Sequence, residues 1–390
     1  MSNIYRLGNL LDTIIDNRGK TPPLSISGIP LIETNAIKGT GKYINYEKIS
    51  KYVSIDIYNS YFRSGNPQYG DILISLVGTL GEVAYIKNDN ISIAQNIIAL
   101  RFKSELCNSN FMYYLLNSNI IKERILKLDR GTAQPNIKVS DLKNIKISLP
   151  PIINQQKIAN FLDEKCGVID ELTKDIQSQI ETLENYKKSI ITEAVTKGLN
   201  PNVEMKDSGI EWIGMIPKHW DVIATKYCFY INNGSEPITS EGDTPVYGSG
   251  SKSFKTCVEY KEGPTVLLGR KGTINIPQWI EGNYWNVDTA FDVKSKGNYN
   301  LKLFYYASIC FDYDRYSTQT ALPSMTQGNY NNFKLPYMNK IEQQEIVEYL
   351  DNKCNEIESL INDKKKQLEI LEQYKKSIIY EYVTGKKEVI

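Results

Sequence analysis

Residues 153–196 read INQQKIANFLDEKCGVIDELTKDIQSQIETLENYKKSIITEAVT, and residues 341–384 read IEQQEIVEYLDNKCNEIESLINDKKKQLEILEQYKKSIIYEYVT. The two stretches align without a gap at an offset of 188 residues, and 24 of their 44 positions are identical. An internal repeat of this strength indicates that the chain of 390 residues consists of two similar halves.

Each copy of the repeat is predicted to form one long helix. Apolar residues recur in both copies at steps of three and four, which is a heptad-like pattern. Some 40 residues at ~1.5 Å each make a rod of roughly 60 Å, which is long for a globular helix. We therefore expect the two helices to pair through this stripe, although two separate core helices are the alternative. The stripe residues are Ile169, Leu172, Ile176, Leu183, Tyr186 and Ile190, then Ile357, Leu360, Leu371, Tyr374 and Ile378.

Composition is that of a folded protein without a strong charge. Hydrophobic residues make up 41% and charged residues 23% of the chain, and the formal net charge is +1. No global basic field therefore indicates nucleic acid, and a DNA binder of this composition would have to localise its charge. The six cysteines contain no CxxC pair, and no signal peptide or long apolar run is seen, so we expect a cytoplasmic protein with reduced thiols. Cys166 and Cys354 are repeat equivalents that either approach each other or serve as small buried residues.

The stretches between the helices are predicted to be α+β domains with mostly antiparallel sheets. In the first, β-type runs at 29–35, 70–86, 92–102 and 144–149 surround one helix at 110–126. The second repeats this order, with 244–250 opposite 29–35, Gly272-Thr273 opposite Gly78-Thr79, and 320–325 opposite 132–137. The predicted boundaries are 1–150 and 218–338 for the domains, 151–197 and 339–390 for the helices, and 198–217 for a linker. A pseudo-twofold axis would make the helical pair antiparallel.

Catalytic motifs are missing from the sequence. It has no GxxxxGK[ST] phosphate loop, and we interpret Asn66-Pro67-Gln68-Tyr69 as a turn because no Gly-rich cofactor loop precedes it. His219 is the single histidine, which argues against acid–base triads and histidine metal sites, and we expect it to pack beside Trp220. The sequence therefore predicts neither a catalytic residue nor a metal ligand.

Three motifs resemble those of the specificity subunits (HsdS) of type I restriction–modification systems. They are GTAQPNIKVSDLKNIKISLPPIINQQKIANFLD at 131–163, GIEWIGMIPKHW at 209–220 and PVYGSGS at 245–251. The resemblance extends over essentially the whole chain. Two departures are that the first domain lacks the WIG…IP…W lead-in, and that TALPSMTQGNY at 320–330 differs from the usual GT-x-Q pattern.

The resemblance implies a non-catalytic subunit that binds a bipartite double-stranded DNA target. Each half-site would be read by one of two target-recognition domains, and the antiparallel helices would set the spacer between half-sites. Two methyltransferase subunits using S-adenosylmethionine would dock on the helices, and two restriction subunits using ATP and Mg would join where present. No membrane is implied. Other classes that fit are a recognition module of an enzyme fused elsewhere and a coiled-coil scaffold with two protein-binding domains.

DNA contacts are expected from polar and glycine-rich loops. Lys, Arg and backbone N–H groups suit phosphates, while Arg, Asn and Gln suit base edges. The repeated tyrosine pairs, Tyr113-Tyr114 and Tyr305-Tyr306, are interpreted as core residues and not as base-stacking residues. The candidates are Arg18, Lys20, Arg130, Gly131, Thr132, Gln134, Asn136 and Lys138 in the first domain, and Ser249, Ser251, Lys252, Arg270, Lys271, Thr273, Gln319, Ser324 and Gln327 in the second.

Overall fold

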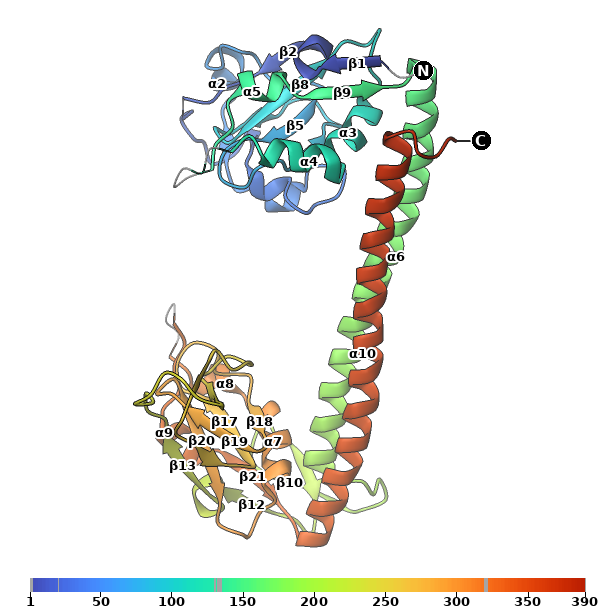
Figure 1. Cartoon of the computed structure of the whole chain (residues 1–390). Helices are drawn as coiled ribbons and strands as arrows, with labels where there is room; N and C mark the ends of the chain where they lie inside the picture. The colour runs from blue at the N-terminus through green and yellow to red at the C-terminus, as the bar shows by residue number, and fades with distance from the viewer. Residues whose placement is uncertain (1–2, 20, 130, 132–134, 319–321, 390) are drawn as a thin grey trace. The chain divides into compact units, whose positions relative to one another are not determined.

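The computed structural model describes residues 3–19, 21–129, 131, 135–318 and 322–389 (Figure 1). It divides into two compact units: unit 1 is Met1–Gln177 with Lys366–Ile390, and unit 2 is Ser178–Lys365. Each unit holds one globular domain and part of both long helices, α6 (Ile152–Lys197) and α10 (Lys340–Val383). The two helices confirm that each copy of the sequence repeat is helical.

The globular domain of unit 1 is built on an antiparallel sheet in the order β2-β8-β5-β6, formed by Leu11–Ile15, Ile97–Phe102, Ile72–Ser75 and Val83–Tyr85. A second sheet, β4-β3-β7 (Tyr52–Val53, Ile29–Ile32 and Ser92–Ile93), contains one parallel pair, β3 with β7. Strands β1 (Asn3–Arg6) and β9 (Lys146–Leu149) close the domain where the chain enters α6. Short helices are α1 (Leu7–Leu10), α2 (Ile55–Ser60) and α5 (Val139–Lys143), with 3-10 turns at Thr34–Ala36 and Tyr46–Lys48.

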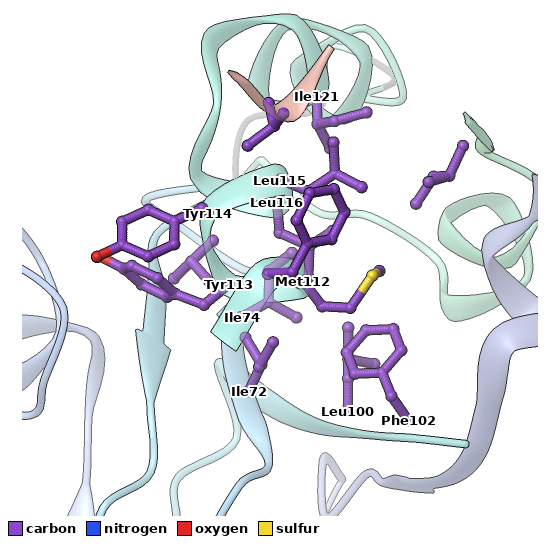
Figure 2. Packing of buried hydrophobic residues seen from close by; sticks show 14 of the residues in the cluster. Ile72, Ile74, Leu100, Phe102, Met112, Tyr113, Tyr114, Leu115, Leu116 and Ile121 are labelled. Carbon is purple, nitrogen blue, oxygen red and sulfur yellow. The ribbon is translucent and has the colours of Figure 1, made fainter. Parts of the chain in front are cut away.

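Two helices cover the first sheet, α3 (Ser109–Asn117) and α4 (Asn119–Leu126), where the sequence predicted one helix over 110–126. That prediction was wrong because Ser118 has extended backbone, with ψ of 146°, and ends α3 before α4 begins. Figure 2 shows Met112 and Leu116 of α3 among the sheet residues Ile74 and Leu100. The core of unit 1 is therefore largely aliphatic.

The globular domain of unit 2 repeats this plan. Its antiparallel sheet β13-β20-β17-β18 is formed by Phe229–Asn233, Ala290–Ser295, Thr265–Gly269 and Gln278–Ile280. A second sheet, β15-β14-β19-β16, comprises Lys255–Cys257, Thr244–Tyr247, Asn283–Asn286 and Lys261–Glu262, with β14 parallel to β19. Strands β12 (Asp221–Ala224) and β21 (Lys334–Tyr337) pair at the entrance to α10. The helices are α7 (Leu301–Ile309), α8 (Tyr313–Tyr316) and α9 (Gln327–Asn332), with a 3-10 turn at Thr225–Tyr227.

The stretch at 198–217, predicted as a linker, contains an ordered hairpin of unit 2. Strand β10 (Met205–Asp207) pairs antiparallel with β11 (Met215–Pro217). Trp220, which follows the hairpin, is buried, and its indole N–H donates to Glu342 Oε1 over 3.3 Å. His219 packs beside Trp220 as expected, with ring centroids 6.3 Å apart, and its Nε2 lies 2.8 Å from the same oxygen.

Within each unit, the segments of α6 and α10 lie side by side and run antiparallel (Figure 1). In unit 1, the Phe161 and Tyr382 rings are 4.4 Å apart, and Lys375 Nζ lies 2.5 Å from Asp170 Oδ1. In unit 2, Lys187 pairs with the carboxylate of Glu358. The two ion pairs are the same pair under the 188-residue repeat, and such polar partners in a helical seam fix its register.

Part of the predicted apolar stripe lies outside this seam. Leu172, Tyr186, Leu360 and Tyr374 are 45%, 57%, 52% and 55% exposed, so their assignment to the seam was wrong. The reason is geometric: between residues 164 and 190 the buried or half-buried positions are 166, 169, 173, 176, 180, 183, 187 and 190, which is a strict heptad spacing. Leu172 and Tyr186 each precede a seam position that is occupied by Thr173 or Lys187.

A buried tyrosine of each domain anchors it to its long helix. Tyr114 donates to Asp163 Oδ1 over 2.6 Å in unit 1, and Tyr306 donates to Asp351 Oδ1 over 2.6 Å in unit 2. Tyr113 packs against Tyr114 with centroids 5.1 Å apart, at one end of the cluster in Figure 2. Tyr113, Tyr114 and Tyr306 are thus buried core residues, as the sequence predicted, whereas Tyr305 is half-buried.

The helices of the described ranges include none that is both long and apolar enough to cross a membrane. The six cysteines are free thiols, and all except Cys310 are buried.

Candidate nucleic-acid interface

In unit 1 the centre of the candidate surface is a loop crossing, by which we mean the point where the turn between two strands is hydrogen-bonded to a second loop. The turn between β5 and β6 meets residues 135–137, with Gly78 N–H donating to the Pro135 carbonyl and Ile137 N–H donating to the Leu76 carbonyl, both over 2.9 Å. Val77 and Asn136 form an isolated antiparallel bridge between them. Gly78 has φ of 75°, a conformation that glycine adopts without strain, so the turn can approach the second segment.

The same crossing occurs in unit 2. Gly272 N–H donates to the Pro323 carbonyl, and Met325 N–H donates to the Arg270 carbonyl, again over 2.9 Å. Lys271 and Ser324 form the equivalent bridge, and Gly272 has φ of 81°. The sequence alignment of these loops is confirmed at the level of individual hydrogen bonds.

A cleft of about 790 Å³ opens beside the crossing of unit 1. It brings together three of the predicted candidates, Arg18, Asn136 and Lys138, and the last two are exposed. Its other lining residues are Asp16, Gly19, Thr21, Pro22, Leu24, Leu31, Glu33, Lys51, Val77, Ala94, Gln95, Asn96, Ile137 and Val139.

Arg18 links two segments that line this cleft. Its Nε and Nη2 lie 2.9 Å from the two carboxylate oxygens of Asp16, and its Nη1 donates to the Ile137 carbonyl over 3.2 Å. Burial alone would raise the pKa of Asp16, but the hydrogen bonds and charge of Arg18 outweigh it and hold that pKa below its ordinary value. The guanidinium therefore orders the segment that carries Asn136, while the exposed Lys138 ammonium can face a phosphate.

A smaller cavity of about 330 Å³ adjoins the crossing of unit 2. Four predicted candidates line it, together with four further residues. Arg270 Nη1 donates to the Asp288 carbonyl over 3.3 Å, whereas Lys271 is exposed. The Gln327 amide donates to the Ile231 carbonyl, so it ties α9 to the sheet. The lining residues are Arg270, Lys271, Ser324, Gln327, Asn233, Phe291, Met325 and Thr326.

The remaining candidates of unit 2 lie around this crossing without lining the cavity. Ser249 is half-buried, and a Cβ added at Gly272 would lie 3.5 Å from its Oγ. Ser251 and Lys252 are exposed farther along the same loop. Thr273 is half-buried in the turn itself.

Five candidates fall outside the described residues: Lys20, Arg130, Thr132, Gln134 and Gln319. Their neighbour Gly131 is described. It is exposed and has φ of 69°, as expected for a glycine in a tight turn.

Two polar residues of the unit 1 cleft, Gln95 and Asn96, were missed from sequence. Gln95 and Asn96 follow the short strand β7, and Leu76 N–H donates to the Asn96 carbonyl over 2.9 Å. Nothing in a six-letter SIAQNI run indicates that its amides face the loop at 135–137, since that depends on the fold.

Over the described residues, no group of three or more His, Cys, Asp and Glu side chains is arranged to hold a metal ion. What the surface offers is exposed amide, hydroxyl and ammonium groups on two glycine-bearing turns. These groups suit hydrogen bonding to base edges and phosphates.

Comparison with known families and proteins gives a consistent result. Residues 19–182 and 217–370 match the family described as type I restriction modification DNA specificity domain. A putative type I restriction enzyme MjaX specificity subunit of Methanocaldococcus jannaschii is 28% identical over 358 residues, covering 82% of this chain and 79% of that protein. The EcoBI specificity subunit of Escherichia coli is 24% identical over 169 residues, covering 43% of this chain and 35% of that protein.

A solved structure shares the fold. A chain from a structure described as showing complex assembly and conformational transition of the type I R-M system matches with a TM-score of 0.72 and 15% identity, covering 98% of this chain and 97% of that one. The HsdS subunit of Thermoanaerobacter tengcongensis matches over 98% of this chain and 97% of that one, with a TM-score of 0.49 and 16% identity.

Proposed function

Because the chain belongs to the type I restriction–modification DNA specificity family and carries two target recognition domains, we propose that it binds a bipartite double-stranded DNA target, one half-site per domain. The observation that supports this most directly is the pair of loop crossings. Their backbone hydrogen bonds are equivalent, yet their side chains differ, with Leu76-Val77 in one domain and Arg270-Lys271 in the other. Two surfaces with the same backbone arrangement but different side chains suit the recognition of two different DNA sequences.

The long helices are proposed to set the spacer between the half-sites. Both helices run through both units, since α6 contributes residues to unit 1 and to unit 2, and so does α10. A helix lengthens by ~1.5 Å per residue, against ~3.4 Å per base pair of DNA, so rod length can be converted into unread base pairs.

Two methyltransferase subunits are proposed to dock on the helices. Apolar residues that remain exposed there recur at repeat-equivalent positions: Leu172 with Leu360, and Tyr186 with Tyr374. Two matched surfaces favour two copies of one partner. S-adenosylmethionine would then belong to the partners, as would the ATP and Mg of restriction subunits where these are present. This chain is proposed to have no catalytic activity of its own and to act in the cytoplasm.

The proposal is tested by sequencing the methylated sites of a host that carries this chain with its methyltransferase. We expect methylated adenines in a two-part motif with a fixed spacer. A methylated motif without two parts, or turnover by the purified chain that one substitution here abolishes, would contradict the proposal.

The spacer is tested by inserting four residues after Gln177, which should lengthen α6 by ~6 Å. The half-sites should stay the same while the spacer grows by about one or two base pairs. An insertion of the same length between Ser208 and Gly209, in the β10–β11 turn, is the control and should leave the spacer unchanged. An unchanged spacer in the first variant would refute the role of the helices.

A further inference from the structure

We propose that Gln95 is a specificity-determining residue of the first domain and that Asp288 has the same role in the second. The inference rests on the proposed function and adds to it which positions read a base. We infer that Gln95 selects an adenine and that Asp288 selects a cytosine in their respective half-sites.

The two residues occupy equivalent backbone positions. Ala94 N–H donates to the Ile32 carbonyl over 2.9 Å in unit 1, and Val287 N–H donates to the Tyr247 carbonyl over 3.0 Å in unit 2. Gln95 and Asp288 are the next residues in each chain segment.

The next residues along the chain, Asn96 and Thr289, are hydrogen-bonded through their carbonyls to the turns that form the two loop crossings. The Asn96 carbonyl accepts from Leu76 over 2.9 Å, and the Thr289 carbonyl accepts from Arg270 over 2.7 Å. Both Gln95 and Asp288 are thus held beside a loop crossing by bonds on either side, and both are exposed.

Gln95 has the chemistry and the freedom to read an adenine. It lines the cleft with Asn136 and Lys138, and its amide nitrogen donates one bond to Thr21 Oγ1 over 2.5 Å. Within the described residues this is the one hydrogen bond of its side chain, so a second N–H and the carbonyl oxygen are available. A Gln amide forms a bidentate pair with adenine N6 and N7 in the major groove.

Four of the charged residues in the cleft are paired with each other, while Lys138 is exposed. Asp16 holds Arg18, and Glu33 Oε1 lies 2.8 Å from Lys51 Nζ. Asn96 is held too, since its amide nitrogen donates to Thr34 Oγ1 over 2.5 Å. Gln95 is therefore the exposed amide of this loop with a free bonding edge.

Asp288 presents the opposite hydrogen-bonding character at the same position. A carboxylate only accepts, which suits the cytosine N4 amino group and disfavours a phosphate. The backbone of Asp288 is fixed because its carbonyl accepts from Arg270 Nη1 over 3.3 Å. Replacement of Gln by Asp at one backbone position thus changes which base satisfies it.

The experiment compares Gln95→Ala and Asp288→Ala with the unchanged chain, each assembled with the methyltransferase and offered a library of randomised half-sites. Gln95→Ala should lose ~10- to 100-fold selectivity at one A·T position of the first half-site only. Asp288→Ala should do the same at one C·G position of the second half-site only. Gln68→Ala is the matched control, because Gln68 is exposed in the same domain but does not line the cleft, and its motif should be unchanged.

The outcomes separate this inference from the proposed function. An unchanged chain without a two-part motif overturns both. A normal two-part motif that neither alanine variant alters overturns the inference alone, and so does a uniform loss of methylation across all sequences, because that is the behaviour of a phosphate contact. Thermal unfolding of each variant checks that it folds. If Gln95→Ala lowers the unfolding temperature, Gln95→Glu, which has a side chain of the same size, takes its place and should shift the preferred base.

Discussion

The contacts between each globular domain and its long helix are nearly the same in the two units. Gln155 accepts from Asn108 N–H over 2.9 Å, and Gln343 accepts from Asn300 N–H over 2.6 Å. The tyrosine-to-aspartate anchors have equal lengths of 2.6 Å. Even the lysine that joins each aspartate is present twice, although Lys42 comes from a loop and Lys302 from α7.

The loop crossings show the reverse pattern, in which backbone is kept and side chains change. Unit 2 places Arg270 and Lys271 on the turn, where unit 1 has Leu76 and Val77. Unit 1 supplies its exposed cation from Lys138 instead. The difference separates two kinds of position: the residues that join a domain to its helix make nearly the same contacts in both units, and the side chains around the crossing differ on an equivalent backbone.

Exchange of a whole domain should produce the largest effect on this comparison. Replacing residues 1–143 by the corresponding part of another family member should replace one half of the methylated motif completely. The other half should be unchanged, since unit 2 keeps its own crossing. Sequencing of methylated sites measures this, and the reciprocal exchange of the second domain is the control. A change in both halves would show that the domains do not read independently.

The repeat-equivalent cysteines, Cys166 and Cys354, test whether the cores of the two units shield their buried thiols from reagents to the same extent. Burial raises the pKa of Cys166 to about 11 and also raises that of Cys354. At a pKa near 11 the Cys166 thiol has ~240-fold less thiolate at pH 8 than a free cysteine, and the pKa of Cys354 is shifted in the same direction, so iodoacetamide should modify both slowly. Because the unfolded thiol ionises from about pH 8.5, stability should fall as pH rises from there toward 11. Mass spectrometry follows the rates, with the chain in denaturant as control; fast reaction at one site alone would show that its unit opens.

Loss of the anchoring aspartates should affect unit 1 more than unit 2. Lys42 is 11% exposed and has four tyrosine ring centroids within 5.1–5.8 Å, whereas Lys302 is 29% exposed. Burial lowers the pKa of Lys42, and Asp163 opposes that shift. Asp163→Asn leaves a cation without its charge partner and should cost ~3 kcal/mol, against ~1 kcal/mol for Asp351→Asn.

Hydrogen exchange resolved by domain measures these losses separately in the two units. Tyr114→Phe and Tyr306→Phe are the matched controls. Each removes one hydrogen bond to a carboxylate and should cost a similar ~1.5 kcal/mol. Equal losses for the two aspartate variants would contradict a special role of Lys42.

The two long helices and the equivalent turns could be predicted from the sequence because they belong to the internal repeat. Identity at an offset of 188 residues locates both helices, and the aligned turns locate Gly78 and Gly272. The seam was less predictable: Leu172 and Tyr186 fit a three-four spacing as well as Thr173 and Lys187 do, and apolar character favoured the wrong pair. Only the opposite helix, which supplies Glu358 to Lys187, decides between them.

The candidate surface was predictable only in part. Loop motifs identified Asn136, Lys138 and Lys271, which lie at the crossings. Arg18 was chosen for its charge, but its guanidinium is bound by Asp16, a contact that motif reading does not weigh. Gln95 was missed because it reaches the crossing through pairing of β3 with β7, which is not encoded within the local run.

The two crossing glycines should give the smallest effects, and nearly equal ones. Gly78 and Gly272 have φ of 75° and 81°, where a Cβ costs ~1 kcal/mol, and an added Cβ would meet no atom within 4 Å at Gly78 and only ordinary contacts at Gly272. Gly78→Ala and Gly272→Ala should therefore each destabilise their own domain by about that amount in hydrogen exchange. Gly167→Ala is the control with the opposite sign, because Gly167 is helical, exposed and open to a methyl group, so α6 should gain ~1 kcal/mol. A clear loss at one crossing without a loss at the other would mean that the shared backbone frame is not equally important in the two domains.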